Sequence, residues 1–437
     1  MNYLLTWQDA SLENHVDLLT GFPFKSQQFT EEPSDIPLVK GANVHQAYID
    51  WKDAKRWSAS EFSQYKKFQL QSGDVVVAMD RPWIEAGLKY AWIRPNDPKS
   101  LLVQRVARLR GTNGLLTVYL RYLIGSPAFT DYIKPIVTGV TVPHISADQI
   151  KGFKFLLPPL PIQRKIAGIL SAYDDLIENN TRRIEILEEM ARSIYREWFV
   201  KFRFPGHEQV QMVDSELGLI PEGWEITSLG NHINTQKGYA FKSSWYQEQG
   251  IKIVKVSDFT DYSIDISKLV SISEEIAGQY KKHELKANDI IIQTVGSWAS
   301  NPQSVVGKVI RVPNIAAKTL LNQNAVKVIT KESINQIFLF YSIKNERFKS
   351  YIIGCAQGAA SQASITLDAI REFKILLPPS SLLDFLADFV SPMWKLINNL
   401  EDKNLNLRCT RDYLLPRLIS GEIDVENLDI NTGEIAA

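Results

Sequence analysis

Residues 161–198 read PIQRKIAGILSAYDDLIENNTRRIEILEEMARSIYREW, and their seam positions are separated by alternating steps of four and three residues. These positions are Ile166, Leu170, Tyr173, Ile177, Asn180, Ile184, Leu187, Ala191, Ile194 and Trp198. A spacing of about 3.5 residues, held over this length, indicates a coiled-coil helix. Pro161 supports a helix start here, because proline suits the first turn, where its missing N–H is not needed. The stretch therefore predicts one long helix with a continuous seam.

A second seam follows 220 residues later. Its positions are Leu386, Val390, Met393, Ile397, Leu400, Asn404, Leu407, Arg411, Leu414 and Leu418. Each seam contains one asparagine, which we expect in neighbouring layers, where a buried polar residue sets register or orientation. We predict that the two helices of one chain pair as an antiparallel, pseudo-twofold coiled coil. The alternative is that each helix only packs on its own globular domain, but one-sided packing does not require so strict a period.

The segments that precede the two helices are also copies of one another. Matched residues recur at offsets of 215 to 220 positions, and small loop insertions explain the drift. The matched pairs include Trp7 with Trp224, Leu12 with Leu229, His15 with His232, Gly21 with Gly238, Phe24 with Phe241, Asp74 with Asp289, Phe129 with Phe348 and Phe153 with Phe373. An internal repeat of this kind predicts two related domains.

Each copy has a mixed pattern of short strands and helices. Runs rich in β-formers (75–77, 251–256 and 305–309) alternate with helical stretches (115–124 and 334–344) and with Gly/Pro breaks. We therefore predict two tandem globular domains of mixed α/β (α+β) fold. The predicted boundaries are 1–157 for the first domain, 158–202 for the first helix, 203–222 for a linker, 223–377 for the second domain, 378–420 for the second helix and 421–437 for an acidic tail.

Composition narrows the class of protein. The chain of 437 residues is 45% apolar and has two cysteines, Cys355 and Cys409, too few for a disulfide framework or a four-cysteine zinc site. It has no apolar run of membrane-spanning length and no signal-peptide pattern at its start, so we expect a cytoplasmic protein. Net charge is zero, but residues 1–155 and 216–375 each carry +3. Two mildly basic domains are compatible with DNA binding without requiring it.

Motifs for catalysis are missing. We find no P-loop, no His-Glu-x-x-His, no Gly-x-Ser-x-Gly, no amino-methyltransferase motif and no metal-ligand spacing among the six histidines. We therefore expect no catalytic residue and no metal site in this chain. A self-contained nuclease or methylase is the first alternative, and a coiled-coil scaffold without a nucleic-acid role is the second.

Three segments carry a resemblance to a known family. Leu157-Pro-Pro-Leu-Pro-Ile-Gln163, followed by Ala167, Leu170 and Asp174-Asp175, resembles the conserved region of type I restriction–modification specificity subunits, as does the stretch 408–424. Gly218–Trp224 resembles the lead-in to a target-recognition domain of that family. The second helix lacks the glutamine found at Gln163, so that end could contact a partner differently, and the first domain lacks the Ile-Pro-x-Gly-Trp lead-in.

The resemblance implies a non-catalytic subunit whose two target-recognition domains each read one half of a bipartite double-stranded DNA site. It implies helices that fix the spacing between the half-sites and dock two modification subunits. S-adenosylmethionine, used for adenine-N6 methylation, would lie on those partners. ATP and Mg would lie on the restriction subunits of the full complex, and this chain would bind no cofactor.

Candidate DNA-binding residues are polar or basic side chains on loops, because such groups read base edges and phosphates. In the first domain they are Lys25, Ser26, Lys55, Arg56, Lys66, Lys67, Arg81, Gln104, Arg105, Thr141 and His144. In the second they are Lys242, Ser243, Lys281, Lys282, Ser297, Gln323, Asn324, Ser361 and Gln362. We expect His15 and His232 to be structural, and Trp83 and Trp298 to belong to the cores.

Overall fold

The structure is a computed structural model that describes residues 7–84, 87–137, 143–260, 263–298, 305–358 and 362–430. Its contacts divide the chain into two compact units. Unit 1 comprises Met1–Ile177 and Leu407–Ala437, and unit 2 comprises Glu178–Asn406. Each unit therefore contains one globular head together with a part of each long helix.

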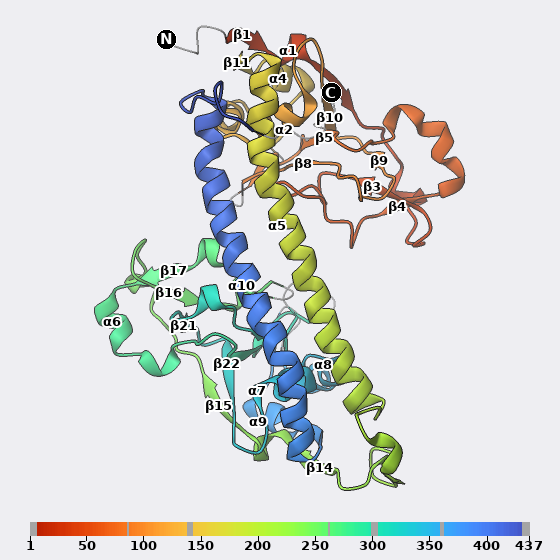
Figure 1. The fold of residues 1–437 in the computed structure, drawn as a ribbon, viewed down its shortest axis with the longest axis vertical. Coiled ribbons are helices and arrows are strands. Elements are labelled where there is room, and N and C mark those ends of the chain that lie inside the picture. Colours follow the sequence, from red (N-terminus) through yellow and green to blue (C-terminus); the bar gives the residue numbers. More distant parts are fainter. Residues whose placement is uncertain are drawn as a thin grey trace. The chain divides into compact units, whose positions relative to one another are not determined.

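The head of unit 1 is built from three small sheets, a hairpin and short helices (Figure 1). Strand β1 (Gln8–Ser11) pairs with β11 (Lys154–Leu157); the four-stranded sheet has the order β2 (Val16–Thr20), β10 (Val106–Gly111), β5 (Val75–Ala78), β8 (Tyr90–Trp92); and the three-stranded sheet has the order β4 (Arg56–Trp57), β3 (Ile36–Val39), β9 (Leu101–Leu102). The hairpin is β6 (Trp83–Ile84) with β7 (Gly87–Leu88), and the α-helices are α1 (Leu12–His15), α2 (Thr117–Gly125), α3 (Pro127–Ile133) and α4 (Ala147–Lys151).

The head of unit 2 repeats this topology. Strand β14 (Glu225–Ser228) pairs with β24 (Lys374–Leu377); the four-stranded sheet has the order β15 (Ile233–Lys237), β22 (Ala325–Thr330), β18 (Ile290–Gln293), β20 (Val309–Arg311); and the three-stranded sheet has the order β17 (Val270–Ile272), β16 (Ile251–Val254), β21 (Leu320–Leu321). The remaining pairs are β12 (Met212–Val213) with β13 (Ile220–Pro221) and β19 (Val295–Gly296) with β23 (Ala363–Ser364). The α-helices are α6 (Glu274–Gly278), α7 (Gln336–Ile343), α8 (Glu346–Gly354) and α9 (Leu367–Glu372). The duplication predicted from the sequence is confirmed.

A matched glycine shows why the copies agree. A Cβ on Gly21 would lie 2.2 Å from the backbone oxygen of Val103, and one on Gly238 would lie 2.0 Å from the backbone oxygen of Asn322. Real Cβ atoms do not approach backbone atoms so closely. Only glycine therefore fits at these two positions, which directly follow β2 in unit 1 and β15 in unit 2.

Two of the predicted strand runs are longer than the strands. Strand β16 ends at Val254, and a 3-10 turn over Val256–Asp258 follows it. The other difference lies over residues 305–309. Strand β20 begins only at Val309, because Gly307 adopts a φ of +84° and interrupts the extended backbone before it. Val305 makes only an isolated bridge to Ser297.

The long helices are α5 (Leu160–Tyr195), which continues as a π-helical turn over Arg196–Val200, and α10 (Ser380–Ile419). In Figure 1, α10 in blue runs beside α5. Within unit 2, Asn180 Nδ2 donates to Asn404 Oδ1 at 2.9 Å, so the two seam asparagines bond directly. Both are buried, and this amide pair sets the local register of the antiparallel helices.

The seam is buried unevenly. The buried positions are Ile166, Leu170, Ile177, Asn180, Ala191, Leu386, Val390, Ile397, Leu400, Asn404 and Leu418. The half-buried positions are Tyr173, Ile184, Leu187, Ile194, Trp198, Met393, Leu407, Arg411 and Leu414. In unit 2 the same seam also closes the head core, since Leu386, Val390 and Ile397 belong to it. The predicted pairing and the alternative of packing on the head therefore both occur.

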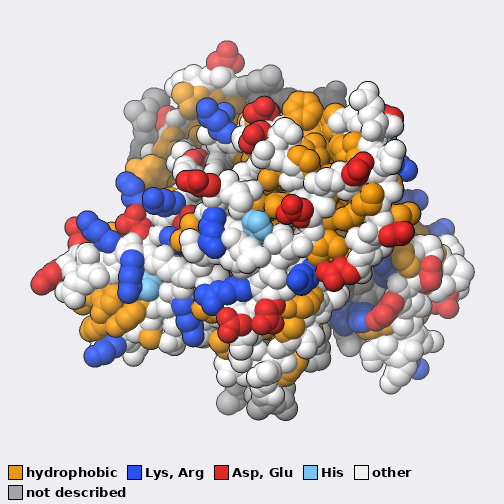
Figure 2. All heavy atoms as spheres, turned by 90° about the horizontal axis from the view of Figure 1, so that it is seen from below, with side chains coloured by type: hydrophobic (Ala, Val, Ile, Leu, Met, Phe, Trp, Pro, Cys, Tyr) orange, Lys and Arg blue, Asp and Glu red, His pale blue; other side chains and the backbone are white. Residues whose placement is uncertain are grey.

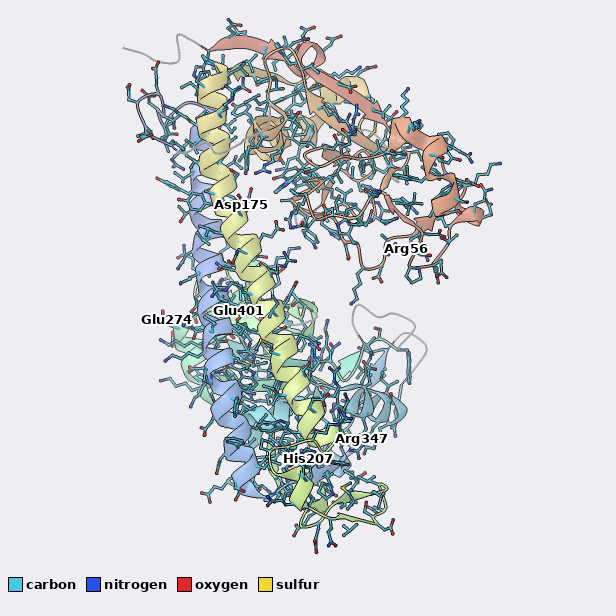
Figure 3. The ribbon with its side chains drawn as sticks, turned by 45° about the vertical axis from the view of Figure 1, so that its right-hand side comes forward. Arg56, Asp175, His207, Glu274, Arg347 and Glu401 are labelled. Carbon is cyan, nitrogen blue, oxygen red and sulfur yellow. The ribbon has the colours of Figure 1, made fainter. Side chains whose placement is uncertain are left out.

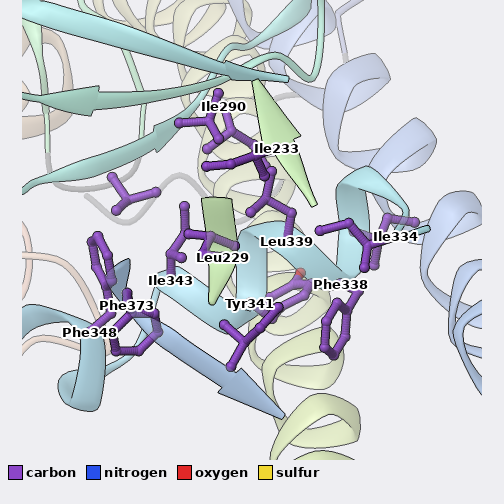
Figure 4. Packing of buried hydrophobic residues seen from close by; sticks show 14 of the residues in the cluster. Leu229, Ile233, Ile290, Ile334, Phe338, Leu339, Tyr341, Ile343, Phe348 and Phe373 are labelled. Atoms are coloured by element: carbon purple, nitrogen blue, oxygen red, sulfur yellow. The ribbon is translucent and has the colours of Figure 1, made fainter. Parts of the chain in front are cut away.

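The core of unit 2 lies between the four-stranded sheet, α7 and the helix pair. Figure 4 shows part of it, where Leu339 of α7 lies against Ile233 and Ile290 of the sheet. The core of unit 1 is built in the same way, from residues of its four-stranded sheet, of α2 and of the two long helices. The long helices contribute Ile166, Leu170 and Leu418 among others. Within the described ranges, no helix combines the length and the apolar character needed to cross a membrane.

Candidate nucleic-acid interface

Three loops of unit 1 meet where β5 ends. The Met79 N–H donates to the Arg105 carbonyl (2.8 Å), and the Met79 carbonyl accepts from the Ile145 N–H (2.9 Å). The Arg81 N–H donates to the Pro143 carbonyl (2.6 Å). These backbone bonds bring together four candidates that are far apart in the sequence: Arg81, Gln104, Arg105 and His144.

Most of these side chains face solvent. Arg81, Gln104 and Arg105 are exposed, and His144 is partly buried. Arg105 lies 3.9 Å from Asp80, a loose pair on the surface. Arg81 and Arg105 have φ values of +45° and +67°. Non-glycine residues rarely adopt such φ values, and backbone strain of this kind concentrates at functional sites.

Unit 2 has the equivalent junction after β18. The Thr294 N–H donates to the Asn324 carbonyl (2.8 Å), and the Thr294 carbonyl accepts from the Ile365 N–H (2.9 Å). The Val306 N–H donates to the Ser297 carbonyl (3.1 Å). The junction therefore gathers Ser297, Gln323, Asn324 and Gln362, the last of which directly precedes β23. The candidates Thr141 and Ser361 lie outside the described residues.

The other candidates of unit 1 lie on the lobe around the three-stranded sheet, whose core contains Phe24, Leu38 and Trp57. They are Lys25, Ser26, Lys55, Arg56, Lys66 and Lys67. Arg56, at the outer side of this lobe in Figure 3, donates to the Asp35 carbonyl at 2.8 Å. Lys55 lies 2.6 Å from Glu31 and lowers the pKa of that carboxyl. Both basic groups therefore already have partners in the free protein.

The corresponding lobe of unit 2 carries Lys242, Ser243, Lys281 and Lys282, all exposed. The Lys242 ammonium lies 5.4 Å from the centre of the Trp245 ring. Figure 2, which shows one face of the molecule, has basic and acidic side chains interspersed rather than one continuous basic area. On this face, a DNA contact would therefore depend on particular loops more than on a broad positive field.

The expectations for the repeated histidines are confirmed. His232 Nδ1 lies 2.7 Å from the Ser333 hydroxyl, and Nε2 lies 3.1 Å from the Thr227 hydroxyl. His15 Nδ1 lies 2.9 Å from the Asn113 carbonyl. Burial lowers the pKa of His232, so its neutral ring is favoured. These rings join local elements and are not free to act on a ligand.

The expectation for the tryptophans is half right. Trp298 is partly buried and packs on the core of unit 2. Trp83, however, is 39% exposed, because it stands on the two-stranded β6–β7 hairpin, which no further strand of the described residues extends, whereas its cross-strand partner Leu88 is buried in the core. Sequence reasoning also passed over Lys134, whose ammonium lies 4.8 Å from the centre of the Trp83 ring.

Each head is fixed to the start of its long helix by a side-chain amide. In unit 1, Gln163 is fully buried; its Oε1 accepts from the Leu116 N–H (2.9 Å) and its Nε2 donates to the carbonyls of Gly114 (2.7 Å) and Pro158 (2.8 Å). The position equivalent to Gln163 in unit 2 is Leu383, and there the Asn335 Nδ2 donates to the Leu383 carbonyl at 2.8 Å. Gln163 therefore joins the head to α5 and is not available to a partner. In unit 2 the corresponding amide comes from Asn335 of the head and not from the long helix.

A second contact between head and helix differs between the units. In unit 1, Asp174 on α5 accepts from the Tyr122 hydroxyl (2.7 Å) and from Arg411 Nη1 (2.7 Å). Arg121 lies over the Trp92 ring at 4.6 Å. In unit 2, Trp394 occupies the position equivalent to Asp174; its Nε1 donates to the Tyr341 hydroxyl (3.1 Å), and Arg311 lies over its ring at 5.0 Å.

A buried carboxyl group lies beside Arg311. Glu401 on α10 (Figure 3) has an Oε2 atom without a hydrogen-bond partner among the described residues. Burial raises the pKa of Glu401 to about 7, with Glu188 and Asp402 adding to the rise and Arg311 opposing it. Burial also raises the pKa of Glu188. In the described part of the chain, no cluster of His, Cys, Asp and Glu could hold a metal ion.

Known proteins agree with this architecture. The family model described as "Type I restriction modification DNA specificity domain" matches the chain twice, over residues 6–189 and 221–406. The chain belongs to this family. It is a type I restriction–modification specificity subunit with two target-recognition domains, a non-catalytic component for DNA recognition.

Relatives of this specificity subunit cover most of its length. It is 28% identical to the MjaIX specificity subunit of Methanocaldococcus jannaschii, over 72% of this chain and 71% of that one. It is 24% identical to the EcoBI specificity subunit of Escherichia coli, over 99% of this chain and 90% of that one. The crystal structure of a type I S subunit from M. genitalium matches with a TM-score of 0.53 at 14% identity, over 94% of this chain and 96% of that one, which shows a shared fold.

Proposed function

We propose that each unit reads one half of a bipartite double-stranded DNA site, through the loops that meet beyond β5 in unit 1 and beyond β18 in unit 2. The observation that carries this proposal is the convergence of polar side chains at equivalent places in two copies of one fold. Those places carry Gln104 and Arg105 in unit 1 but Gln323 and Asn324 in unit 2. Different donors and acceptors at equivalent positions would read different bases.

The lobe residues Lys25, Lys66 and Lys67 in unit 1, and Lys242, Lys281 and Lys282 in unit 2, are proposed to contact phosphates. Phosphate contacts set orientation and make affinity depend on salt, whereas base contacts give specificity. Lys55 and Arg56 would need to leave Glu31 and the Asp35 carbonyl first.

We propose that the free face of the helix pair docks a modification subunit. In unit 2, Ile186 and Met190 on α5 and Phe385, Phe389 and Leu396 on α10 are all exposed. Their spacings of four and seven residues keep each set on one side of its helix. Trp394 and Ile397, which face the head, are buried instead. A row of large apolar side chains on the side away from the head suits another helix.

The equivalent face of unit 1 is more polar, with Leu176 and Tyr413 exposed. Because the fold is duplicated, we propose two modification subunits per chain, one on each unit. S-adenosylmethionine would lie on these partners, and ATP and Mg on restriction subunits. A cytoplasmic location fits such a system.

The helices are also proposed to set the spacer between the half-sites, because α5 and α10 each contribute residues to both units. Deleting four residues within 166–198 would shorten α5 by about 6 Å. The preferred spacer should then change by about one or two base pairs while both half-sites stay the same. An unchanged spacer would contradict this role.

The direct test is duplex binding by the chain in complex with its modification subunits. We expect affinity for DNA to fall steeply as salt rises, because phosphate neutralisation releases counterions. Alanine at Lys66 and Lys67 should reduce the salt slope, and alanine at the exposed Lys349, on α8 of unit 2, serves as the control. Binding that does not occur, or does not respond to salt, would overturn the proposal.

A further inference from the structure

The β6–β7 hairpin of unit 1 leaves two consecutive large apolar side chains partly exposed. Trp83 is 39% exposed and Ile84 is 37% exposed. The hairpin itself is anchored, since Leu88 pairs with Trp83 across the strands and is 5% exposed within the core. The exposed pair is therefore held on a fixed support, and it is not the fraying edge of a loop.

The backbone around the hairpin is tied on both sides. The Arg81 N–H donates to the Pro143 carbonyl (2.6 Å), and the Lys89 N–H donates to the Pro82 carbonyl (2.7 Å). Arg81 is held at a φ of +45° directly before the buried Pro82. Strain at a non-glycine residue persists only where the surroundings impose it. These ties keep Trp83 next to the junction that carries Arg105 and His144.

One cation lies against the exposed ring, and two others stand on the neighbouring loops. Lys134 lies 4.8 Å from the centre of the Trp83 ring, and Arg81 and Arg105 are exposed on the neighbouring loops. Their acidic neighbours are loosely placed: Asp131 lies 3.7 Å from Lys134, and Asp80 lies 3.9 Å from Arg105. Exposed pairs of this kind contribute little, so both cations can turn to phosphates. An exposed aromatic ring with cations beside it matches a ligand that combines anionic groups with flat apolar faces, which is the chemistry of nucleic acid.

Unit 2 has no such pair at the equivalent place among its described residues. After β18 the chain forms β19 (Val295–Gly296), which pairs with β23, and the tryptophan that follows, Trp298, packs on the core.

We propose that Trp83 forms an apolar wedge that packs against DNA bases in the half-site read by unit 1, at a step where the bases part or unstack. This inference rests on the proposed function, because it needs unit 1 to lie on DNA. Lys134, Arg81 and Arg105 hold the flanking phosphates while the wedge makes the apolar contact. Steps that unstack easily are favoured at this point, so the wedge adds sequence preference without hydrogen bonds to base edges.

The test uses the complex with its modification subunits and a duplex that carries both half-sites. Trp83→Ala should weaken binding to this duplex by about 10-fold or more, since stacking on an aromatic ring contributes substantially for each base. Its salt slope should not change, because no phosphate contact is lost. Lys134→Ala should lower the salt slope by about one. Leu156→Ala, which removes an equally exposed apolar side chain from β11 of the same unit, should change neither quantity.

A second measurement guards against misfolding. Permanganate reactivity of thymines in the first half-site should rise when the wild-type complex binds, and the rise should vanish with Trp83→Ala but persist with Trp83→Phe. Unchanged affinity and unchanged reactivity in Trp83→Ala would overturn the wedge. An equal loss of binding to specific and non-specific DNA would also overturn it. If the wild-type complex shows no salt-dependent binding at all, the proposed function fails instead.

Discussion

The same contact between head and helix is charged in unit 1 and aromatic in unit 2. Asp174 in unit 1 lies among Arg121, Tyr122 and Arg411, and its side chain is 10% exposed. The equivalent residues in unit 2 are Trp394, Phe340, Tyr341 and Ala191, the last of which is fully buried. An ionic cluster has therefore been exchanged for apolar packing without a change of fold.

One interaction survives this exchange with its partners reversed. The register of the sheets makes Trp92 and Arg311 equivalent, since they pair with the matched residues Val75 and Ile290. In unit 1 the strand supplies the tryptophan and α2 supplies the arginine, whereas in unit 2 the strand supplies the arginine and α10 supplies the tryptophan. The comparison teaches that the position of the contact is constrained but its chemistry is free, provided that both sides change together.

The largest expected effect is on the aromatic side of this comparison. Trp394→Ala should destabilise unit 2 by about 3–5 kcal/mol, because it leaves a cavity and removes the donor to Tyr341. Hydrogen exchange should quicken in α7 and in the part of α10 that belongs to unit 2. Exchange in α2 and β10 of unit 1 is the internal control, and a change there as large as in α7 would contradict the account.

Asp174→Ala should destabilise unit 1 by about 3 kcal/mol, because it leaves the largely buried Arg121 without its carboxylate and Arg411 with Asp412 alone. The double variant Asp174→Leu with Arg411→Ala imitates the apolar chemistry of unit 2 and should recover part of the loss. Hydrogen exchange in α2 measures both. A double variant that is no more stable than Asp174→Ala would show that the exchange of chemistry needs more than these two positions.

The pH dependence should differ between the units because of Glu401. Its pKa of about 7 in the fold lies above its ordinary value of 4.5, so the fold favours the protonated carboxyl. Its contribution to the stability of unit 2 is therefore full below pH 4.5 and is lost as pH rises toward 7 and beyond. Glu401→Gln should remove this loss, which makes unit 2 about 2 kcal/mol more stable than the wild type at pH 8. The test is the rate of hydrogen exchange in α10 from pH 5 to 8, with each observed rate corrected for the intrinsic exchange rate at that pH. Equal slopes for variant and wild type would refute it.

The smallest effects concern the amide ties. Gln163→Leu should cost unit 1 about 2 kcal/mol, since it leaves one buried N–H and two carbonyls without their partner. Asn335→Ala should cost unit 2 about 1 kcal/mol, because it removes both the cap of α7 and the bond to the Leu383 carbonyl. Thermal unfolding of the two variants compares them. A larger loss for Asn335→Ala would reverse the ranking.

Periodicity and self-similarity predicted the parts of the molecule that depend on repeated local rules. The seams from Ile166 and Leu386 onward, the matched strands and the two-domain plan follow from spacing alone. The asparagines were expected in neighbouring layers but bond directly, because the register of an antiparallel pair depends on contacts that one sequence does not display.

The candidate site was less predictable. Loops 81, 104–105 and 143–144 meet through backbone bonds, which leave no trace in residue type. Trp83 was assigned to the core because most tryptophans are buried, yet it stands on a two-stranded hairpin and is 39% exposed, while its cross-strand partner Leu88 is buried. The sequence also did not reveal that Asn335 of unit 2 makes the head-to-helix contact that Gln163 makes in unit 1. The two amides lie in different elements, so an alignment of the copies does not pair them.

The central claim is that the two units read separate halves of one DNA site. The most direct measurement is the set of methylated sequences produced by the complex with its modification subunits, for the wild type and for two double variants. Gln104→Ala with Arg105→Ala should relax or change one half-site only, and Gln323→Ala with Asn324→Ala should affect only the other, with the spacer unchanged in both. If either variant altered both halves, or if neither altered any, the claim would be contradicted.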